Sequence, residues 1–223
     1  MYDKIACEGD WTDLSDGEQG AMPRANGSPL FWTAKRLFDV TVAALGLPFV
    51  AVIGIFLLFL NPFWNPGPLL FRQVRMGRNG QPITVFKFRS MTESAGTVRG
   101  PDDPVELDRI TRLGAWLRRT RIDELPQFVA VLVGDMSLVG PRPDCLDHAE
   151  AYTRIVPGYR ARHAVRPGIS GYAQVRLGYA EGFELTARKT MLDLEYIARA
   201  GWRLEALILR QTIVVVSTGF GAR

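Results

Sequence analysis

The segment Val40–Leu60, VTVAALGLPFVAVIGIFLLFL, decides how this chain is organised, because it contains no charged side chain. At a helical rise of about 1.5 Å per residue it would reach roughly 30 Å, the thickness of the hydrocarbon core of a bilayer. The segment therefore predicts a membrane element. A chain of 223 residues can also bury one good-sized core, so we expect a single domain beside that element.

Two features of the segment bear on its course through a membrane. Pro48, with Gly46 close by, should kink a helix near the first third of the run. Basic residues flank both ends: Lys35 and Arg36 before it, and Arg72, Arg75 and Arg78 after it. Positively charged flanks favour the cytoplasmic side. The residues alone favour a re-entrant hairpin only slightly over a plain membrane span.

The flanking regions differ in character. Residues 1–32 mix Gly, Ser, Asp, Asn and Pro with little periodicity, and we interpret them as a flexible tail. Residues 69–71 and 83–88 predict two short strands, joined by a hairpin turn at residues 77–80. Lys87 and Arg89 alternate with two phenylalanines, so the second strand carries two cations on one face. An ordinary half-buried strand and a substrate-facing strand are equally good readings of that alternation.

The charge balance indicates an anionic partner. The net charge is +4 and the pI is near 9.3, which suits nucleic acid, a lipid surface or a nucleotide. The charge is uneven, since residues 1–34 hold six acidic and two basic side chains, whereas residues 62–92 hold basic side chains and no acidic one. Cys7 and Cys145 match no zinc or redox spacing, which favours a reducing compartment.

Two adjacent carboxylates, Asp123 and Glu124, follow an arginine-rich stretch and are the candidate reactive groups. Pro126 is tolerated only in the first turn of a helix, so residues 125–133 predict a helix with Asp123 as its N-cap and Gly134 at its end. The helix dipole and nearby arginines would favour ionised Asp123, the form that a nucleophile or metal ligand needs. Glu124 adds an oxygen donor suited to Mg²⁺.

Arginines on both sides of this pair have predictable directions. Ile110, Leu113 and Leu117 form an apolar helical stripe, and Arg118 stands beside it, so Arg118 should point into the fold towards an anion near Asp123. The Gly-Pro-Arg-Pro turn at residues 140–143 should hold the Arg142 guanidinium in a fixed direction, which suits bidentate binding of phosphate oxygens.

The C-terminal third predicts three helices and a loop. Residues 145–165 and 185–199 look helical, and the loop at residues 167–174 could bind a nucleotide through backbone groups. For Tyr172 in that loop, packing is favoured over stacking on a ligand. Residues 204–216 retain charges and are too short to span a bilayer, so they predict an interfacial amphipathic helix or a core helix.

The sequence resembles the monotopic bacterial phosphoglycosyl transferases, also called bacterial sugar transferases, over residues 33–223. Five motifs in order carry the resemblance: KRLFD at 35–39, FKFRSM at 86–91, DELPQ at 123–127, GDMSLVGPRP at 134–143 and RPGISGYAQV at 166–175. Two positions depart from the family pattern. The family often has Ser-Pro at the membrane break, where this chain has Leu47-Pro48, and it often has Asn-Gly-Arg where this chain has Arg176-Leu177-Gly178.

The resemblance implies an α+β fold, mostly helical with a small sheet, with a re-entrant membrane helix-break-helix and interfacial amphipathic helices. It divides the chain into a flexible tail (1–32), a re-entrant membrane helix (33–64) and a catalytic domain with membrane-surface helices (65–223). The implied location is the inner membrane of a bacterium, with the catalytic domain on its cytoplasmic face.

The resemblance also implies an activity. A sugar 1-phosphate would pass from a UDP-sugar to polyprenol (undecaprenyl) phosphate with release of UMP, through a covalent phospho-sugar intermediate on Asp123, to begin synthesis of exopolysaccharide or another surface glycoconjugate. Asp123 and Glu124 would be catalytic, with Mg²⁺ on Glu124. The expected phosphate-binding residues are Arg118, Arg142, Lys87 and Arg89, and the expected nucleotide or sugar loop includes Pro167, Gly168, Gln174 and Arg176.

The expected partners are the UDP-sugar, polyprenol phosphate and the bilayer, with no nucleic acid; a homodimer is one open alternative for the oligomeric state. A rival hypothesis is a membrane-tethered basic module that binds anionic lipid or nucleic acid, but it leaves the paired carboxylates unexplained. From the residues alone, Asp123 and Glu124 fit a plain helix cap with salt bridges to arginines equally well. No residue indicates which sugar is carried.

Overall fold

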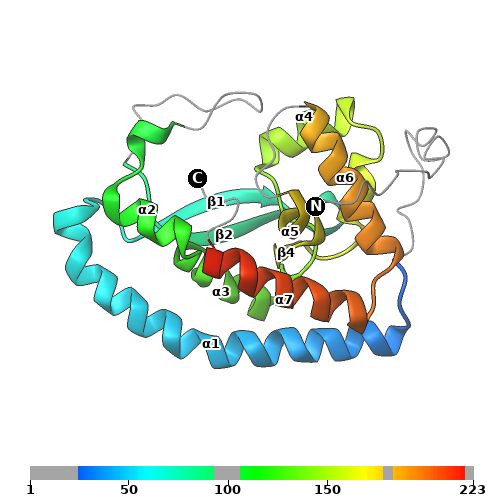
Figure 1. The fold of residues 1–223 in the computed structure, drawn as a ribbon, viewed down its shortest axis with the longest axis horizontal. Helices are drawn as coiled ribbons and strands as arrows, with labels where there is room; N and C mark the ends of the chain where they lie inside the picture. Colours follow the sequence, from blue (N-terminus) through cyan, green and yellow to red (C-terminus); the bar gives the residue numbers. More distant parts are fainter. Residues whose placement is uncertain (1–24, 93–105, 178–182, 219–223) are drawn as a thin grey trace.

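A computed structural model describes residues 25–92, 106–177 and 183–218, so most of the predicted tail lies outside the described residues. Its longest element is helix α1 (Pro29–Trp64), which runs along one edge of the molecule in a gentle arc (Figure 1). The Ser28 side chain caps it by accepting a hydrogen bond from the Phe31 backbone N–H at 3.1 Å. The helix begins before residue 33, the predicted start.

One stripe of α1 is buried and the rest is exposed. The buried residues recur at the spacings of one helical face: Phe31, Lys35, Asp39, Ala43, Val50, Leu57 and Asn61. Large apolar side chains cover the remaining surface: Leu37, Leu45, Phe49, Val52, Ile55, Phe56, Leu58, Phe59, Phe63 and Trp64. In the described part of the chain, α1 is the one helix long and apolar enough to cross a membrane.

The helix continues through Pro48 without a non-helical residue, so the structure has one continuous, curved helix where a helix-break-helix was predicted. Gly46 has a packing role: a Cβ atom there would lie 2.3 Å from the Phe128 ring. The glycine therefore lets α1 approach helix α3 (Phe128–Val133) closely, and Ala43 packs with Ala130 and Val131 in the same contact. The re-entrant course through a membrane stays a prediction.

The predicted hairpin is confirmed, with a longer first strand than expected. Strands β1 (Leu70–Met76) and β2 (Pro82–Phe88) pair antiparallel, with Phe71 opposite Lys87, and a short 3₁₀ turn, η2 (Arg78–Gly80), joins them. Ile83 and Val85 are buried from one face of β2 in the cluster that contains Ala43. Phe88, from the other face, packs with Val50 and Leu57 of α1.

The chain then forms a short 3₁₀ turn, η3 (Leu107–Arg109), and helix α2 (Arg112–Arg119), whose Leu113 and Leu117 are buried as predicted. A 3₁₀ helix, η4 (Ile122–Gln127), leads into α3, and Gly134 ends α3 in the left-handed conformation with φ of 100°, as predicted. Strand β3 (Ser137–Val139) pairs in parallel with β4 (Gly168–Ser170), a second small sheet that the sequence analysis did not identify.

The C-terminal part packs around this second sheet. It contains α4 (Leu146–Ile155), η5 (Tyr159–Ala164), α5 (Tyr172–Leu177), α6 (Phe183–Ala198) and α7 (Trp202–Thr218). The single helix predicted for residues 145–165 is wrong, because the chain turns at Pro157-Gly158 and continues as η5. Tyr172 is buried, as its packing interpretation predicted. The fold is therefore mostly helical with small sheets.

Helix α7 buries one face and exposes the other. Glu205 and Ile208 are buried, whereas Trp202, Ile213, Val214 and Val216 are exposed. Figure 1 shows α7 beside α1, and the ring of Trp202 makes edge contacts with Phe31 and Phe38 of α1. Both helices thus have large apolar side chains that no other described residue covers.

Candidate active site

Asp123 and Glu124 lie in the first turn of η4, which corrects the prediction that Asp123 caps an α-helix. The backbone N–H of Glu124 donates to the carbonyl of Arg121 at 3.2 Å, the spacing of a 3₁₀ helix. Pro126 has no N–H to donate, so the tighter turn continues past it before α3 begins at Phe128. Both carboxylates are buried, with exposed fractions of 7% for Asp123 and 6% for Glu124.

Arg121 makes the sharp connection between α2 and the two carboxylates. Its φ of 59° lies in the left-handed region, which is rare for a residue with a side chain and costs of order 1 kcal/mol. The connection therefore carries backbone strain that the surrounding packing must hold. The chain changes direction at this residue, and η4 packs against strand β2 of the hairpin.

Glu124 is the paired member of the two carboxylates. The Lys87 ammonium donates to Glu124 Oε1 at 2.8 Å, and the Arg142 guanidinium donates to both oxygens, with Nη1 at 3.1 Å from Oε2. Burial opposes ionisation, but Arg142 and then Lys87 outweigh it and hold the pKa of Glu124 well below its usual range. Burial lowers the pKa of Lys87 to about 8, against the opposing charge of Glu124.

Asp123 is the unpaired member. Its Oδ1 atom is buried and has no hydrogen-bond partner among the described residues. Burial, followed by the charge of Glu124, raises the pKa of Asp123 to about 6, although Lys87, Arg142 and Arg118 act against the rise. The predicted direction, in which a helix dipole and arginines favour the ionised form, is therefore wrong, because desolvation and the adjacent carboxylate dominate. Above about pH 6 the carboxylate is still mostly ionised.

The turn that carries Arg142 is fixed through its backbone. The Arg162 guanidinium donates to the Arg142 carbonyl at 2.8 Å, and Arg75 donates to the Pro143 carbonyl at 2.6 Å. The loop predicted to bind a nucleotide also contacts this turn, because the Gly168 N–H donates to the Pro141 carbonyl at 3.0 Å. These hydrogen bonds fix the backbone from which the Arg142 guanidinium reaches Glu124.

Arg162 belongs to a buried set of charged and polar side chains, the Arg162 cluster: Asp144, Tyr159, Arg162, Lys189 and Asp193. Arg162 Nε donates to Asp193 Oδ2 at 2.9 Å, and its Nη1 pairs with Asp144. The Tyr159 hydroxyl and the Lys189 ammonium each donate to Asp144 at 2.6 Å. Charge compensation on this scale keeps Arg162, which is 1% exposed, in the interior beneath the turn.

The other predicted site residues lie at different distances from the carboxylate pair. Arg118 is half-buried and near enough to Asp123 to affect its pKa, and its Nη1 also approaches Met91 Sδ at 3.4 Å. The Arg89 guanidinium lies beside Gly67, just past the end of α1. Pro167 and Gly168 pair through their backbones with Ser137, in the first residues of the parallel sheet.

Gln174 and Arg176, the other two residues of the predicted nucleotide or sugar loop, make local contacts, and their role in binding stays a prediction. Gln174 Nε2 approaches the Ile169 carbonyl at 3.4 Å, while its Oε1 is buried without a partner among the described residues. The Arg176 guanidinium lies 5.1 Å from the centre of the Tyr172 ring, a cation–π contact.

Comparison with known proteins assigns the family. The model of the bacterial sugar transferase family matches residues 30–219. The chain belongs to the bacterial sugar transferase family.

Three relatives illustrate the match. This sugar transferase chain is 41% identical over 199 residues to a UDP-N-acetylgalactosamine-undecaprenyl-phosphate N-acetylgalactosaminephosphotransferase of Aeromonas hydrophila, covering 88% of the chain and 46% of that protein. It is 41% identical over 169 residues to the UDP-glucose:undecaprenyl-phosphate glucose-1-phosphate transferase of Escherichia coli (strain K12), covering 73% and 36%. It is 39% identical over 186 residues to the exopolysaccharide production protein PSS of Rhizobium leguminosarum bv. phaseoli, covering 81% and 93%. The chain thus spans less than half the length of the first two relatives.

The donor set of this sugar transferase chain can be compared with the needs of Mg²⁺, which the family resemblance implies. No group of three or more His, Cys, Asp or Glu side chains lies together among the residues described. Mg²⁺ commonly takes only one or two carboxylates and completes its shell with water and substrate phosphates. Glu124 Oε1 already accepts from Lys87 and Arg142, but Oε2 accepts only from Arg142 and keeps a lone pair, so Oε2 together with the unpartnered Oδ1 atom of Asp123 fits that kind of site. It does not fit an ion held by protein groups alone.

Sequence reasoning missed two groups of residues in this family member. Arg75 and Gln73 lie on the same face of β1, and Gln73 accepts from Arg75 at 2.7 Å, so the alternation of polar residues in that strand could have identified them. The Arg162 cluster gave no local signal, because its members come from three separate stretches of the chain. Their association depends on the tertiary fold.

Proposed function

We propose that this chain is a phosphoglycosyl transferase that moves a sugar 1-phosphate from a UDP-sugar to polyprenol phosphate and releases UMP. The observation that carries the proposal is the asymmetry between the two carboxylates. Glu124 is neutralised by Lys87 and Arg142, whereas Asp123 keeps a buried oxygen without a partner among the described residues. An ionised carboxylate with a raised pKa and no hydrogen bond to weaken it is suited to nucleophilic attack.

In the first half-reaction, an Asp123 oxygen attacks the phosphorus that carries the sugar. The bond from that phosphorus to the bridging oxygen breaks, and the electron pair leaves with UMP. Asp123 then holds the sugar phosphate as an acyl phosphate. In the second half-reaction, an oxygen of the polyprenol phosphate attacks the same phosphorus, the bond to Asp123 breaks, and the products are a polyprenyl diphosphate sugar and free Asp123.

The cations around the pair stabilise the charge that moves during these steps. Phosphoryl transfer depends mainly on positioning and on neutralising phosphate oxygens. Arg142 and Lys87 would contact both Glu124 and the substrate phosphates, and Arg118 would approach from the end of α2. Mg²⁺, held at Glu124, would supply further neutralisation of the diphosphate. We propose that Arg89 does not contact the substrate but lies at the membrane boundary, because its guanidinium is beside Gly67, just past the end of α1.

The membrane arrangement is part of the proposal. We propose that α1 enters one leaflet and returns, with α7 on the membrane surface and the site at the cytoplasmic face. The exposed apolar faces of both helices support membrane contact, and the basic residues on both sides of the uncharged segment 40–60 support a common side. Cysteines introduced at positions 33 and 64 should then react with an impermeant reagent from the same side. Labelling from opposite sides would establish a full span.

The transfer is tested by incubating membranes that contain the full chain with a radiolabelled UDP-sugar. UDP-glucose and UDP-N-acetylgalactosamine are the first donors to try, because relatives are named for them. Label should move into the polyprenyl lipid, with one UMP released per sugar phosphate transferred. Binding without release of UMP from any UDP-sugar would favour a basic binding module instead.

A further inference from the structure

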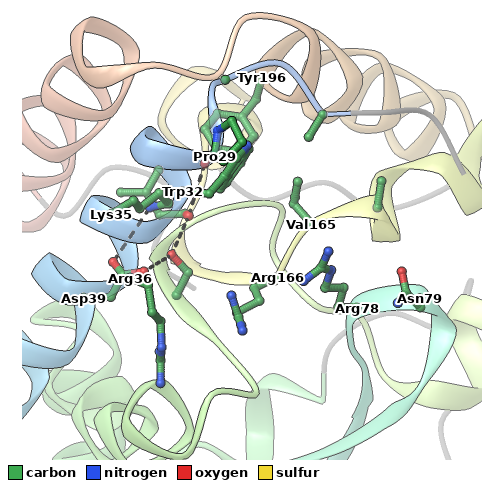
Figure 2. Close-up of a pocket in the computed structure, with 15 residues that line it drawn as sticks. Pro29, Trp32, Lys35, Arg36, Asp39, Arg78, Asn79, Val165, Arg166 and Tyr196 are labelled. Atoms are coloured by element: carbon green, nitrogen blue, oxygen red, sulfur yellow. Dashed lines mark hydrogen bonds and ion pairs between the residues drawn. The ribbon is translucent and has the colours of Figure 1, made fainter.

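A pocket lies near the C-terminal end of α3, where its lining residues Arg36 and Arg166 contact backbone carbonyls. It has a volume of about 490 Å³ and is lined by the start of α1, the turn between β1 and β2, strand β3 and the residues before β4. Figure 2 shows Pro29 and Trp32 on one side of it and Arg78 and Asn79 on the other. None of the carboxylate-site residues lines this pocket.

Its lining has a marked excess of positive charge. Four cationic side chains and one acidic side chain line it: Lys35, Arg36, Arg78, Arg166 and Asp39. The acid is already engaged, since Asp39 accepts from the Ser137 hydroxyl at 2.6 Å and from the Leu138 N–H at 3.2 Å. Lys35 is paired with Glu205 at 2.7 Å. The three arginines therefore remain without an acidic partner among the described residues.

Part of this charge has a structural explanation. The two Nη atoms of Arg36 donate to the carbonyls of Val131 and Leu132, and Arg166 Nε donates to the carbonyl of Gly134. These contacts satisfy carbonyl groups at the end of α3. These contacts give both Nη groups of Arg36 a hydrogen-bond partner. The Nη groups of Arg166 and the whole guanidinium of Arg78 have no hydrogen-bond partner in the described ranges. Like charges held together without a counter-charge favour an anion.

We propose that this pocket binds a phosphate-bearing ligand, with the phosphate held by Arg78 and Arg166 and the remainder of the ligand against Trp32. Guanidinium groups bind phosphate oxygens in pairs, and the Asn79 side chain beside Arg78 adds a donor. The ligand is either a soluble phosphorylated compound or the headgroup of a phospholipid, which present the same chemistry to the arginines.

The pocket and the carboxylate site have no lining residue in common, since Asp123, Glu124, Lys87 and Arg142 are all absent from the pocket wall. The proposal therefore describes a separate site and does not depend on the transfer activity.

The test uses the full chain in detergent, in phosphate-free buffer, titrated with inorganic pyrophosphate by calorimetry. Arg78→Gln is the main variant, because Arg78 is exposed and its replacement breaks no hydrogen bond in the described structure. Arg154→Gln is the matched control, since it removes one exposed arginine from α4. Arg78→Gln should weaken pyrophosphate binding at this pocket by about tenfold, while Arg154→Gln leaves it unchanged. Arg166→Gln should weaken it by a similar factor.

A second arm separates the two sources of phosphate. The same variants are floated with phosphatidylcholine vesicles, with and without phosphatidylglycerol. A loss for Arg78→Gln in the pyrophosphate arm assigns the pocket to a soluble phosphorylated ligand. A loss only with phosphatidylglycerol assigns it to a lipid headgroup. If Arg78→Gln matches Arg154→Gln in both arms, the proposal is overturned. UMP release by Arg78→Gln should equal that of the unmodified chain in every case.

Discussion

The Asp123–Glu124 site and the Arg162 cluster are built from the same kinds of side chain, but they differ in how completely those side chains are paired. In the Arg162 cluster, no buried side-chain nitrogen or oxygen lacks a partner among the residues described. At the site, Glu124 is paired with two cations, and the buried Oδ1 atom of Asp123 has no hydrogen-bond partner among the described residues. The two regions meet at Arg142, whose guanidinium serves the site and whose carbonyl accepts from Arg162.

The difference in pairing indicates that the Arg162 cluster stabilises the fold, whereas the Asp123–Glu124 site is available for chemistry. A buried charge that is fully paired gives rigidity, and removing its partner is costly. A buried carboxylate that is only partly paired costs stability but remains available to a ligand or an electrophile. The account predicts that changes in the Arg162 cluster will act mainly on folding, and that changes at Asp123 will act mainly on chemistry.

The largest expected effect is on turnover. Asp123→Asn keeps the shape of the side chain and removes the nucleophile, so the rate of UMP release in the complete reaction should fall by about 10⁴-fold or more. Retained solubility in detergent and an unchanged circular dichroism spectrum would show that the fold is intact. A rate near that of the unmodified chain would remove Asp123 from the mechanism.

The next effect is on stability. Arg162→Gln leaves the buried Asp193 carboxylate without its hydrogen-bonded cation and removes one of the two cations paired with Asp144, so the free energy of unfolding in detergent should fall by about 3–5 kcal/mol. Arg199→Gln is the matched control, because the Arg199–Glu195 pair lies at the surface, with the Arg199 side chain 69% exposed. Removing that surface pair should cost less than about 1 kcal/mol. Equal losses for the two variants would mean that the cluster does not support the turn.

A third effect is a pH-dependent gain in stability for Asp123→Asn. The pKa of Asp123 is raised in the folded chain from an ordinary value of 3.8 to about 6, so the folded state binds more protons than the unfolded state in that window. Relative to the Asn variant, the unmodified chain should therefore lose stability as the pH rises from about 4 to about 6. Above pH 6 the variant should be more stable by about 2–3 kcal/mol.

Thermal unfolding of both chains across this pH range measures the difference. Below about pH 4 the two chains should have the same stability, because Asp123 is then protonated in both states. A gain that persists unchanged at low pH would show that its cause is something other than the burial of an ionised carboxylate.

The smallest effect concerns Arg142. Arg142→Lys keeps the charge but loses the two-point contact with Glu124, so UMP release in a single turnover should slow by about tenfold. Arg119→Lys, an exposed position on α2, is the control and should have no effect. A normal single-turnover rate for Arg142→Lys would make Arg142 a structural ion-pair partner of Glu124.

Local patterns predicted much of the fold. The uncharged run at residues 40–60 identified α1, the alternation around Gly77–Gly80 identified the hairpin, and Gly134 marked the end of α3. Such signals depend on residues within one or two turns of each other. The prediction failed where the neighbours come from distant parts of the chain. The parallel pairing of β3 with β4 joins segments about thirty residues apart.

The candidate site shows the same division. The adjacent carboxylates and the rigid Gly-Pro-Arg-Pro turn were evident in the sequence, and the structure brings Glu124, Lys87 and Arg142 together. The raised pKa of Asp123 was not predictable, because it depends on burial that only the packed fold creates. The Arg162 cluster was missed for the same reason, since nothing near Arg162 in the sequence identifies Asp193 as its partner.

The central claim is that Asp123 becomes covalently attached to the sugar phosphate, and it is tested most directly without the lipid acceptor. Enzyme mixed with its UDP-sugar should release UMP up to about one equivalent per active site, and then stop. The peptide that contains Asp123 should carry the sugar phosphate, and added polyprenol phosphate should discharge it. Direct attack by the lipid phosphate would instead give no UMP before the lipid is added and no modified peptide.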